Sequence, residues 1–174
     1  MTVGLQCPSL LRPPLTSLGL KATKWDGPED KARGGNAILS FIARGMPRSA
    51  FNAKLYRRLS RMFGFIACNN LHGFWQTHLA TTASRTAFLG QIEQHPCWGQ
   101  SDWTWSDVER QIANRLRDSH LVGAYRAEEK KEMLRAERDQ LARLLAKHGR
   151  PADVMPPALQ AAPQVQGPSQ LGLL

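Results

Sequence analysis

FNAKLYRRLSRMFGFI, residues Phe51–Ile66, is the stretch that decides the fold of this chain. At about 100° per residue, its apolar side chains fall on one wide stripe of a helical wheel. The pattern therefore predicts a helix with one side facing a core, and Ser49 is well placed to cap its N-terminus. The members of the stripe are Phe51, Leu55, Leu59, Met62, Phe63 and Ile66.

The same wheel gathers four basic side chains on a second face of this helix, centred about 120° from the apolar stripe. They are Lys54, Arg57, Arg58 and Arg61. A helix with one core-facing side and one purely basic side raises the question of what the basic side binds.

Apolar residues three and four apart recur along the chain, and no stretch shows the sustained alternation of a β-strand. Together with the opening helix, these segments predict an all-α fold, a small irregular bundle of five to six helices with a long charged C-terminal helix. Besides the opening stretch, we expect helices at 37–44, around 74–79, from about 84 to 92, from 106 with a pause near 119–123, and over 124–148.

Local signals set the boundaries of these helices. Trp25–Pro28, Arg33–Asn36 and Asn69–Gly73 have the composition of turns or breaks. Ser106 and Glu109 have the spacing of a capping box ahead of an apolar period. We therefore divide the chain into an irregular N-terminal arm at 1–35, a helical domain at 36–150 and a disordered tail at 151–174, rich in Pro, Gln and Ala. Trp25 is expected to anchor the arm onto the domain.

Positive charge is concentrated in the first part of the chain. Residues 1–100 hold 12 Lys and Arg against 4 Asp and Glu, a net +8 of the total +9. No acidic residue occurs between Asp30 and Glu93, a stretch that holds nine Lys and Arg. An acid-free basic block indicates affinity for a polyanion, although a basic surface that only keeps the protein soluble is the alternative.

The function that the sequence predicts is nucleic-acid binding by a small, basic, non-enzymatic protein. Lys and Arg side chains on one helical face can neutralise phosphates. Contacts with the phosphate backbone require little recognition of the base sequence. We expect no cofactor, and a partner that is nucleic acid or another polyanion. The predicted binding residues are Lys54, Arg57, Arg58 and Arg61, with Arg44 and Arg48 just ahead of the helix.

Other kinds of site have weaker support. The stretch after Asn69 lacks the Lys or Arg of a DNA-recognition helix, so we predict no helix-turn-helix. The spacing of Cys and His residues matches no common zinc pattern, and no familiar catalytic motif occurs. Trp98, Trp103 and Trp105 are suited to stacking on bases, but we favour the interpretation that they plug the end of the bundle.

Three widely separated cysteines, Cys7, Cys68 and Cys97, do not make a disulfide framework and favour a reducing compartment. No apolar run is long enough to cross a membrane. We expect a cytoplasmic protein without a membrane partner. Targeting to an organelle is the alternative, because residues 1–25 are free of acids, although their prolines interrupt any amphipathic helix.

The 124–148 segment carries a narrow leucine seam and charges of both signs, which is typical of a projecting helix or a short coiled coil. The seam predicts self-association through Leu134, Leu141 and Leu145, and we favour a homodimer. It also supports the alternative function, a helical adaptor or assembly protein that acts through this helix on an acidic protein partner.

Overall fold

The computed structural model describes residues 4–64 and 70–149. These residues contain six α-helices and no β-strand, which confirms the predicted all-α bundle of five to six helices. The elements are η1 (Pro8–Leu11), α1 (Pro28–Ala43), η2 (Arg48–Ala50), α2 (Ala53–Met62), α3 (Leu71–His78), α4 (Thr82–Glu93), α5 (Ser106–Ser119) and α6 (Leu121–His148), where η denotes a 3₁₀ helix.

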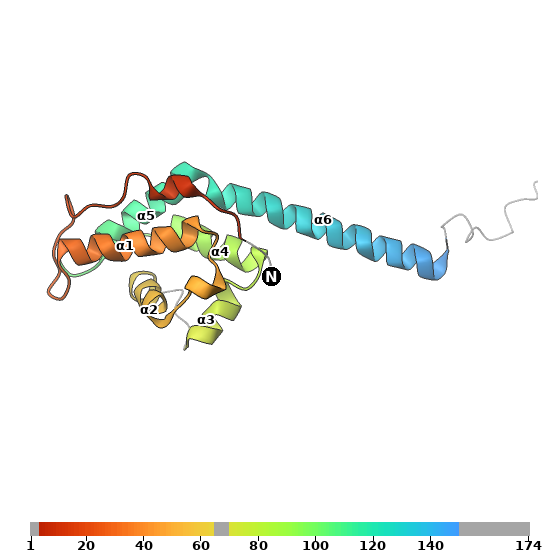
Figure 1. Ribbon diagram of the computed structural model, residues 1–174, viewed down its shortest axis with the longest axis horizontal. Coiled ribbons are helices and arrows are strands. Elements are labelled where there is room, and N and C mark those ends of the chain that lie inside the picture. The colour runs from red at the N-terminus through yellow and green to blue at the C-terminus, as the bar shows by residue number, and fades with distance from the viewer. Residues whose placement is uncertain (1–3, 65–69, 150–174) are drawn as a thin grey trace, which may run out of the picture. The chain divides into compact units, whose positions relative to one another are not determined.

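The chain divides after Met133 into two compact units. In the first unit, α1 packs along α5, and η1 lies against both helices (Figure 1). α4 packs against α5 and α3, while α2 contacts α1 and α3. The second unit includes the last fifteen residues of α6, from Leu134 to His148.

The core of the first unit contains the apolar stripes that the sequence predicts. The described members of the α2 stripe, Phe51 to Phe63, are all buried, whereas Ile66 lies outside the described residues. Phe51 joins an aromatic cluster, with its ring centroid 5.8 Å from Phe41 and 5.5 Å from Phe74. The other predicted stripes are buried too, and comprise Ile38, Leu39, Phe41, Ile42, Phe88, Leu89, Ile92, Val108, Ile112 and Leu116.

α2 begins later than the sequence predicts. Ser49 does not cap it, because Arg48–Ala50 form the 3₁₀ turn η2 and Phe51 has an extended backbone that turns its ring into the core. Asn52 caps the helix instead, since its Oδ1 accepts hydrogen bonds from Lys54 N at 3.1 Å and Leu55 N at 3.0 Å. The cap sets the start of α2, and the buried stripe of the helix leaves its basic face on the other side.

α1 begins nine residues earlier than the predicted start at Ala37, so the predicted arm is not irregular over 28–35. Pro28 at the first helical position and acids in the first turn favour a start there. The glycines that suggested a turn permit close packing: an added Cβ would lie 2.5 Å from the Trp105 ring at Gly34 and 2.6 Å from Leu15 at Gly35. Burial thus outweighs the poor helix propensity of glycine.

The segment ahead of α1 is held against the core by leucines, not by Trp25. Leu10, Leu15 and Leu20 are buried, and the Asn36 amide exchanges two hydrogen bonds of 2.8 Å with the Leu15 backbone. The prediction that Trp25 anchors the arm onto the domain is wrong, because this side chain is 79% exposed and contacts the Lys24 ammonium.

Two further boundary predictions are wrong. Residues 71–73 are the first turn of α3, not a break, because Asn70 caps that helix through a hydrogen bond from Gly73 N. At α5, Ser106 is already helical and makes no capping box with Glu109, which instead contacts His95. The expected pause after α5 is confirmed at His120, which has a left-handed backbone (φ 53°) between α5 and α6.

None of the helices in the described residues is long and apolar enough to span a membrane. The predicted disordered tail at 151–174 lies outside the described residues, as do Cys68 and Asn69. The division into an arm, a domain and a tail therefore stays a prediction.

Candidate functional site

The basic face of α2, defined as Lys54, Arg57, Arg58 and Arg61, lies on the surface of the first unit. The i, i+3, i+4, i+7 spacing aligns these side chains along one side of the helix. Together they line a surface pocket of about 390 Å³. The four basic side chains therefore lie together on one side of α2, as the sequence predicts.

None of the four side chains of the basic face forms an ion pair within the described residues, although Asp26 and Asp30 line a small pocket together with Arg58 and Arg61. Arg57 Nε donates to the Ala53 carbonyl at 3.3 Å, a hydrogen bond that leaves its charge uncompensated. The positive charges of these side chains therefore attract anions from the solvent.

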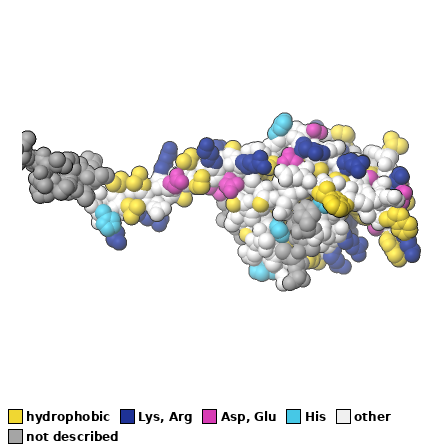
Figure 2. Space-filling view, turned by 180° about the vertical axis from the view of Figure 1, so that it is seen from behind, with side chains coloured by type: hydrophobic (Ala, Val, Ile, Leu, Met, Phe, Trp, Pro, Cys, Tyr) yellow, Lys and Arg dark blue, Asp and Glu magenta, His cyan; other side chains and the backbone are white. Residues whose placement is uncertain are grey.

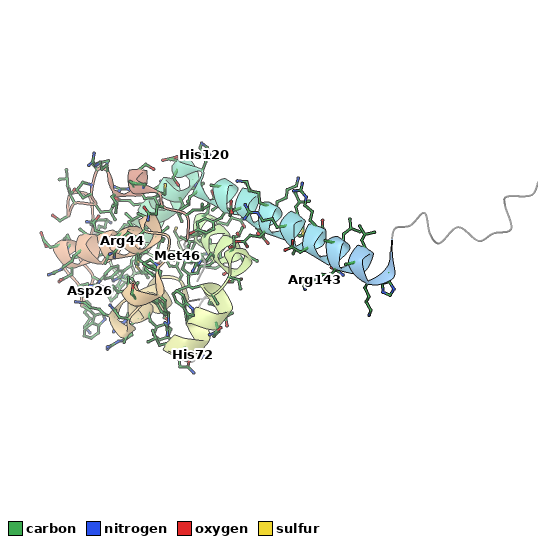
Figure 3. The ribbon with its side chains drawn as sticks, turned by 45° about the vertical axis from the view of Figure 1, so that its right-hand side comes forward. Asp26, Arg44, Met46, His72, His120 and Arg143 are labelled. Atoms are coloured by element: carbon green, nitrogen blue, oxygen red, sulfur yellow. The ribbon has the colours of Figure 1, made fainter. Side chains whose placement is uncertain are left out.

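The two other predicted binding residues have different surroundings. Arg44 follows α1 directly (Figure 3) and lines a groove of about 280 Å³ together with Lys54 and Arg58, so it extends the basic face. The Arg48 guanidinium lies over the Trp75 ring, 4.8 Å from its centroid. A stacked guanidinium keeps its charge while its orientation is fixed.

A larger pocket, of about 680 Å³, adjoins the basic face and is rich in tryptophan. Arg61 lines both the basic face and this pocket. The tryptophans whose rings face solvent are Trp25, Trp98 and Trp103, with exposed fractions of 79%, 76% and 71%. Figure 2 shows that hydrophobic and basic side chains lie next to one another on the surface of this unit.

The prediction that tryptophans plug the bundle is right for one of the three and wrong for the other two. Trp105 is half-buried against the core, covers Gly34, and donates from Nε1 to Asp26 Oδ2 at 3.0 Å. Trp98 and Trp103 lie in the same loop but are exposed.

Buried contacts hold this tryptophan loop in place. Lys31, fully buried on α1, donates from Nζ to the Ser101 carbonyl at 3.1 Å and to the Thr104 carbonyl at 3.0 Å. The same Nζ contacts Asp107 at 2.8 Å and donates to the Lys21 carbonyl at 2.8 Å. One ammonium therefore joins α1, α5, the loop and the segment ahead of α1.

Glu109 and His95 form a buried pair at the floor of the pocket, with Oε2 and Nε2 3.1 Å apart. Burial raises the pKa of Glu109 to about 7, and Asp107 adds to the rise while Lys31 opposes it. Burial also lowers the pKa of His95. Both shifts favour neutral forms, so a protonated Glu109 carboxyl donates to Nε2 wherever His95 is neutral.

The acidic side chains near the pocket have partners within the protein. Asp26 accepts the Trp105 hydrogen bond, Asp30 pairs with Arg33, and Asp102 pairs with Lys21 at 3.5 Å. The pocket is thus aromatic, with Asp26 and Arg61 among its charged lining residues, and it adjoins the basic face.

No group of three or more His, Cys, Asp or Glu side chains could hold a metal ion among residues 4–64 and 70–149. Cys97 Sγ contacts the His95 carbonyl at 3.3 Å, and burial raises the pKa of this thiol. A thiol with a raised pKa is a poor nucleophile at neutral pH.

The predicted self-association residues lie in the second unit. Leu134, Leu141 and Leu145 are 44%, 57% and 37% exposed on α6. Met133 and Leu144 are also exposed.

Comparisons with protein-family models, with curated proteins and with solved structures gave no match. The site is therefore interpreted from its own geometry. Sequence reasoning missed the pocket because Trp25 and Asp26 join it from more than 70 residues away. The available signal was the density of tryptophan in a loop with few apolar neighbours, Trp98–Trp105.

Proposed function

We propose that this protein is a small, non-enzymatic nucleic-acid-binding protein that contacts phosphates through the basic face of α2. The supporting observation is that these four cations lie on one helix, with Arg58 half-buried and the other three exposed, and form no ion pair within the described residues. A face that only keeps a protein soluble usually mixes signs. Arg44, beside Lys54 and Arg58, extends the same surface.

The type of side chain fits this function. Three of the four residues are Arg, whose planar guanidinium binds phosphate oxygens in pairs. Each phosphate contact releases counterions, so binding weakens as salt rises, with a logarithmic slope of about −0.7 to −0.9 per contact.

The test is fluorescence anisotropy with labelled oligonucleotides at about 50 mM and about 200 mM salt. We expect the double substitution Arg57→Gln/Arg61→Gln to weaken binding and to reduce the salt slope by about 1.4 to 1.8. The matched control, Arg117→Gln/Arg126→Gln, removes the same charge from exposed residues of α5 and α6 and should change binding much less. Equal losses in both variants would show that only net charge matters.

A second candidate function is the helical adaptor, favoured by the exposed leucines of the second unit, Leu134, Leu141 and Leu145. In this alternative, α6 binds an acidic protein partner, and nucleic acid is not bound even at low salt. For either function we propose the cytoplasm, or an organelle with a reducing interior, on the evidence of the widely spaced cysteines.

A further inference from the structure

We propose that the nucleic acid bound is single-stranded, and that its unpaired bases stack on Trp25, Trp98 and Trp103 while its phosphates lie on the basic face of α2. This inference rests on the proposed function and names its ligand class. The combination of a positively charged surface with exposed aromatic rings is the general mode by which proteins bind single strands.

The first argument is the exposure of three indole rings around one pocket. Single exposed hydrophobic side chains are ordinary, but large ones gathered at one place indicate a binding surface. All three rings line the same pocket, and each is more than two-thirds exposed. A flat aromatic ring that leaves its face open to solvent accepts any base, whatever its sequence.

The second argument is that the platform is held in position before any ligand binds. Lys31 holds the loop of Trp98 and Trp103 through the Ser101 and Thr104 carbonyls, and Asp26 next to Trp25 accepts the hydrogen bond of Trp105. A ligand therefore does not have to order this loop, and binding loses less entropy.

The third argument is the division of charge between the two surfaces. The charged side chains that line the pocket include Asp26 as well as Arg61, whereas the basic face is lined by cations alone, so phosphates fit the basic face better. Bases carry no such charge, and their exocyclic amino groups are donors that carboxylates accept. Arg61 lines both surfaces, so one strand can occupy both at once.

A duplex fits this arrangement less well, because its bases are already stacked on one another and their faces are closed to the indoles. An anionic membrane surface is the competing partner, since tryptophan and basic residues also gather at membrane interfaces. The Asp26 carboxylate of the pocket favours the single strand, because an anionic lipid headgroup would meet it directly whereas a base carries no charge.

The experiment compares three oligonucleotides of about 16 nucleotides: a single strand of mixed sequence, its duplex, and an abasic single strand with the same phosphates. The full chain is tested as wild type, as Trp98→Ala/Trp103→Ala, and as Trp98→Phe/Trp103→Phe. Both positions are exposed, so the variants should stay folded, which circular dichroism checks. Affinity is measured by anisotropy and stacking by quenching of tryptophan fluorescence.

We expect the wild type to bind the mixed single strand at least tenfold more tightly than the abasic strand. The alanine variant should lose about tenfold or more for the mixed strand, and far less for the duplex and the abasic strand. The phenylalanine variant should recover most of that loss, because it restores an aromatic face.

The failures of the two proposals are distinguishable. If the alanine variant binds the mixed strand as tightly as the wild type, while Arg57→Gln/Arg61→Gln weakens every oligonucleotide, the stacking inference is wrong and the proposed function stands. If the wild type binds no oligonucleotide at low salt, both are wrong. Binding to vesicles of anionic lipid that depends on Trp98 and Trp103, without oligonucleotide binding, would identify a membrane surface instead.

Discussion

Lys31 and Asp107 form a buried ion pair in which Nζ lies 2.8 Å from Oδ1 and 2.9 Å from Oδ2. Lys31 has no exposed surface, and Asp107 also accepts a hydrogen bond from Lys21 N at 3.0 Å. The contact joins residues 76 positions apart and holds α1 to the start of α5. The tryptophan loop depends on it, because the same ammonium holds the Ser101 and Thr104 carbonyls.

The first prediction concerns the loss of this ammonium. Lys31→Met should destabilise the fold by about 3 kcal/mol, because it leaves Asp107 and three carbonyls without their donor in a mostly buried place. Urea unfolding followed by circular dichroism measures the change. Lys21→Met is the control, since Lys21 pairs with Asp102 on the surface and its loss should cost less than about 1 kcal/mol. Equal effects in the two variants would contradict the assigned role of Lys31.

The second prediction contrasts two helical glycines. Gly34→Ala should destabilise the protein by about 1 to 3 kcal/mol, because the new Cβ would lie 2.5 Å from the Trp105 ring. Gly90→Ala in α4 should stabilise it by up to about 1 kcal/mol, since the new Cβ would meet no atom within 4 Å beyond the adjacent residues and the backbone of its own helix, and alanine is the better helix former. Thermal unfolding distinguishes them by opposite shifts in Tm. Shifts of the same sign would mean that α1 does not pack on Trp105 as described.

The third prediction is a pH dependence of stability that arises from Glu109. Its pKa is about 7 in the folded protein and about 4.5 in the unfolded chain. Between these values the unfolded chain binds fewer protons than the folded protein, so the contribution of Glu109 to stability falls as pH rises from about 4.5 to about 7. The cause is burial first, then the charge of Asp107, with Lys31 acting in the opposite direction.

Glu109→Gln tests this dependence, because glutamine keeps the neutral shape at every pH. The difference in unfolding free energy, variant minus wild type, should rise by on the order of 2 kcal/mol between pH 4.5 and 7.5. His95 has a lowered pKa, so its own contribution to stability runs the other way below its ordinary pKa. Because His95 contacts Glu109 directly, the measured difference reports the titration of the pair. A difference that stays constant with pH would show that Glu109 ionises normally.

The sequence predicted helices where one periodic stripe faces the core, as in α2, α4 and α5, because burial of that stripe is a local property of the pattern. The prediction from the sequence was wrong where a tertiary contact determines the backbone conformation. Gly34 and Gly35 lie inside α1, where Trp105 and Leu15 approach too closely for a larger side chain, and these partners lie 71 and 20 positions away in the sequence.

The candidate site likewise has one part that the sequence predicts and one part that it does not. The basic face of α2 was predictable, because all its members lie within eight residues of one helix. The tryptophan pocket was not, since Trp25 and Trp98 lie 73 positions apart in the sequence, in segments that Lys31 and the Asp26–Trp105 hydrogen bond join. A pattern within one segment predicts which side chains share a face, but not which distant loop lies beside it.

The last prediction concerns self-association through the second unit. Leu134, Leu141 and Leu145 are spaced by seven and four residues, as one seam of a coiled coil requires. All three are exposed on α6, and an isolated helix of this length is marginal in water unless it buries its apolar stripe.

Charges of both signs flank the seam at Arg135, Glu137, Arg138 and Asp139, so a second copy of the helix can match them. A dimer would also carry two basic faces and bind a long polyanion more tightly through effective concentration. We expect the wild type to be dimeric at tens of micromolar by light scattering, and Leu141→Glu to be a folded monomer by circular dichroism.

Leu18→Glu is the matched control, since Leu18 is an exposed leucine of the first unit and its substitution should leave the dimer intact. If Leu141→Glu lowers oligonucleotide affinity along with mass, while Leu18→Glu changes neither, the two units act together in binding. A wild type that is already monomeric at these concentrations would rule out the dimer, and the leucine seam would then be expected to bind a different partner.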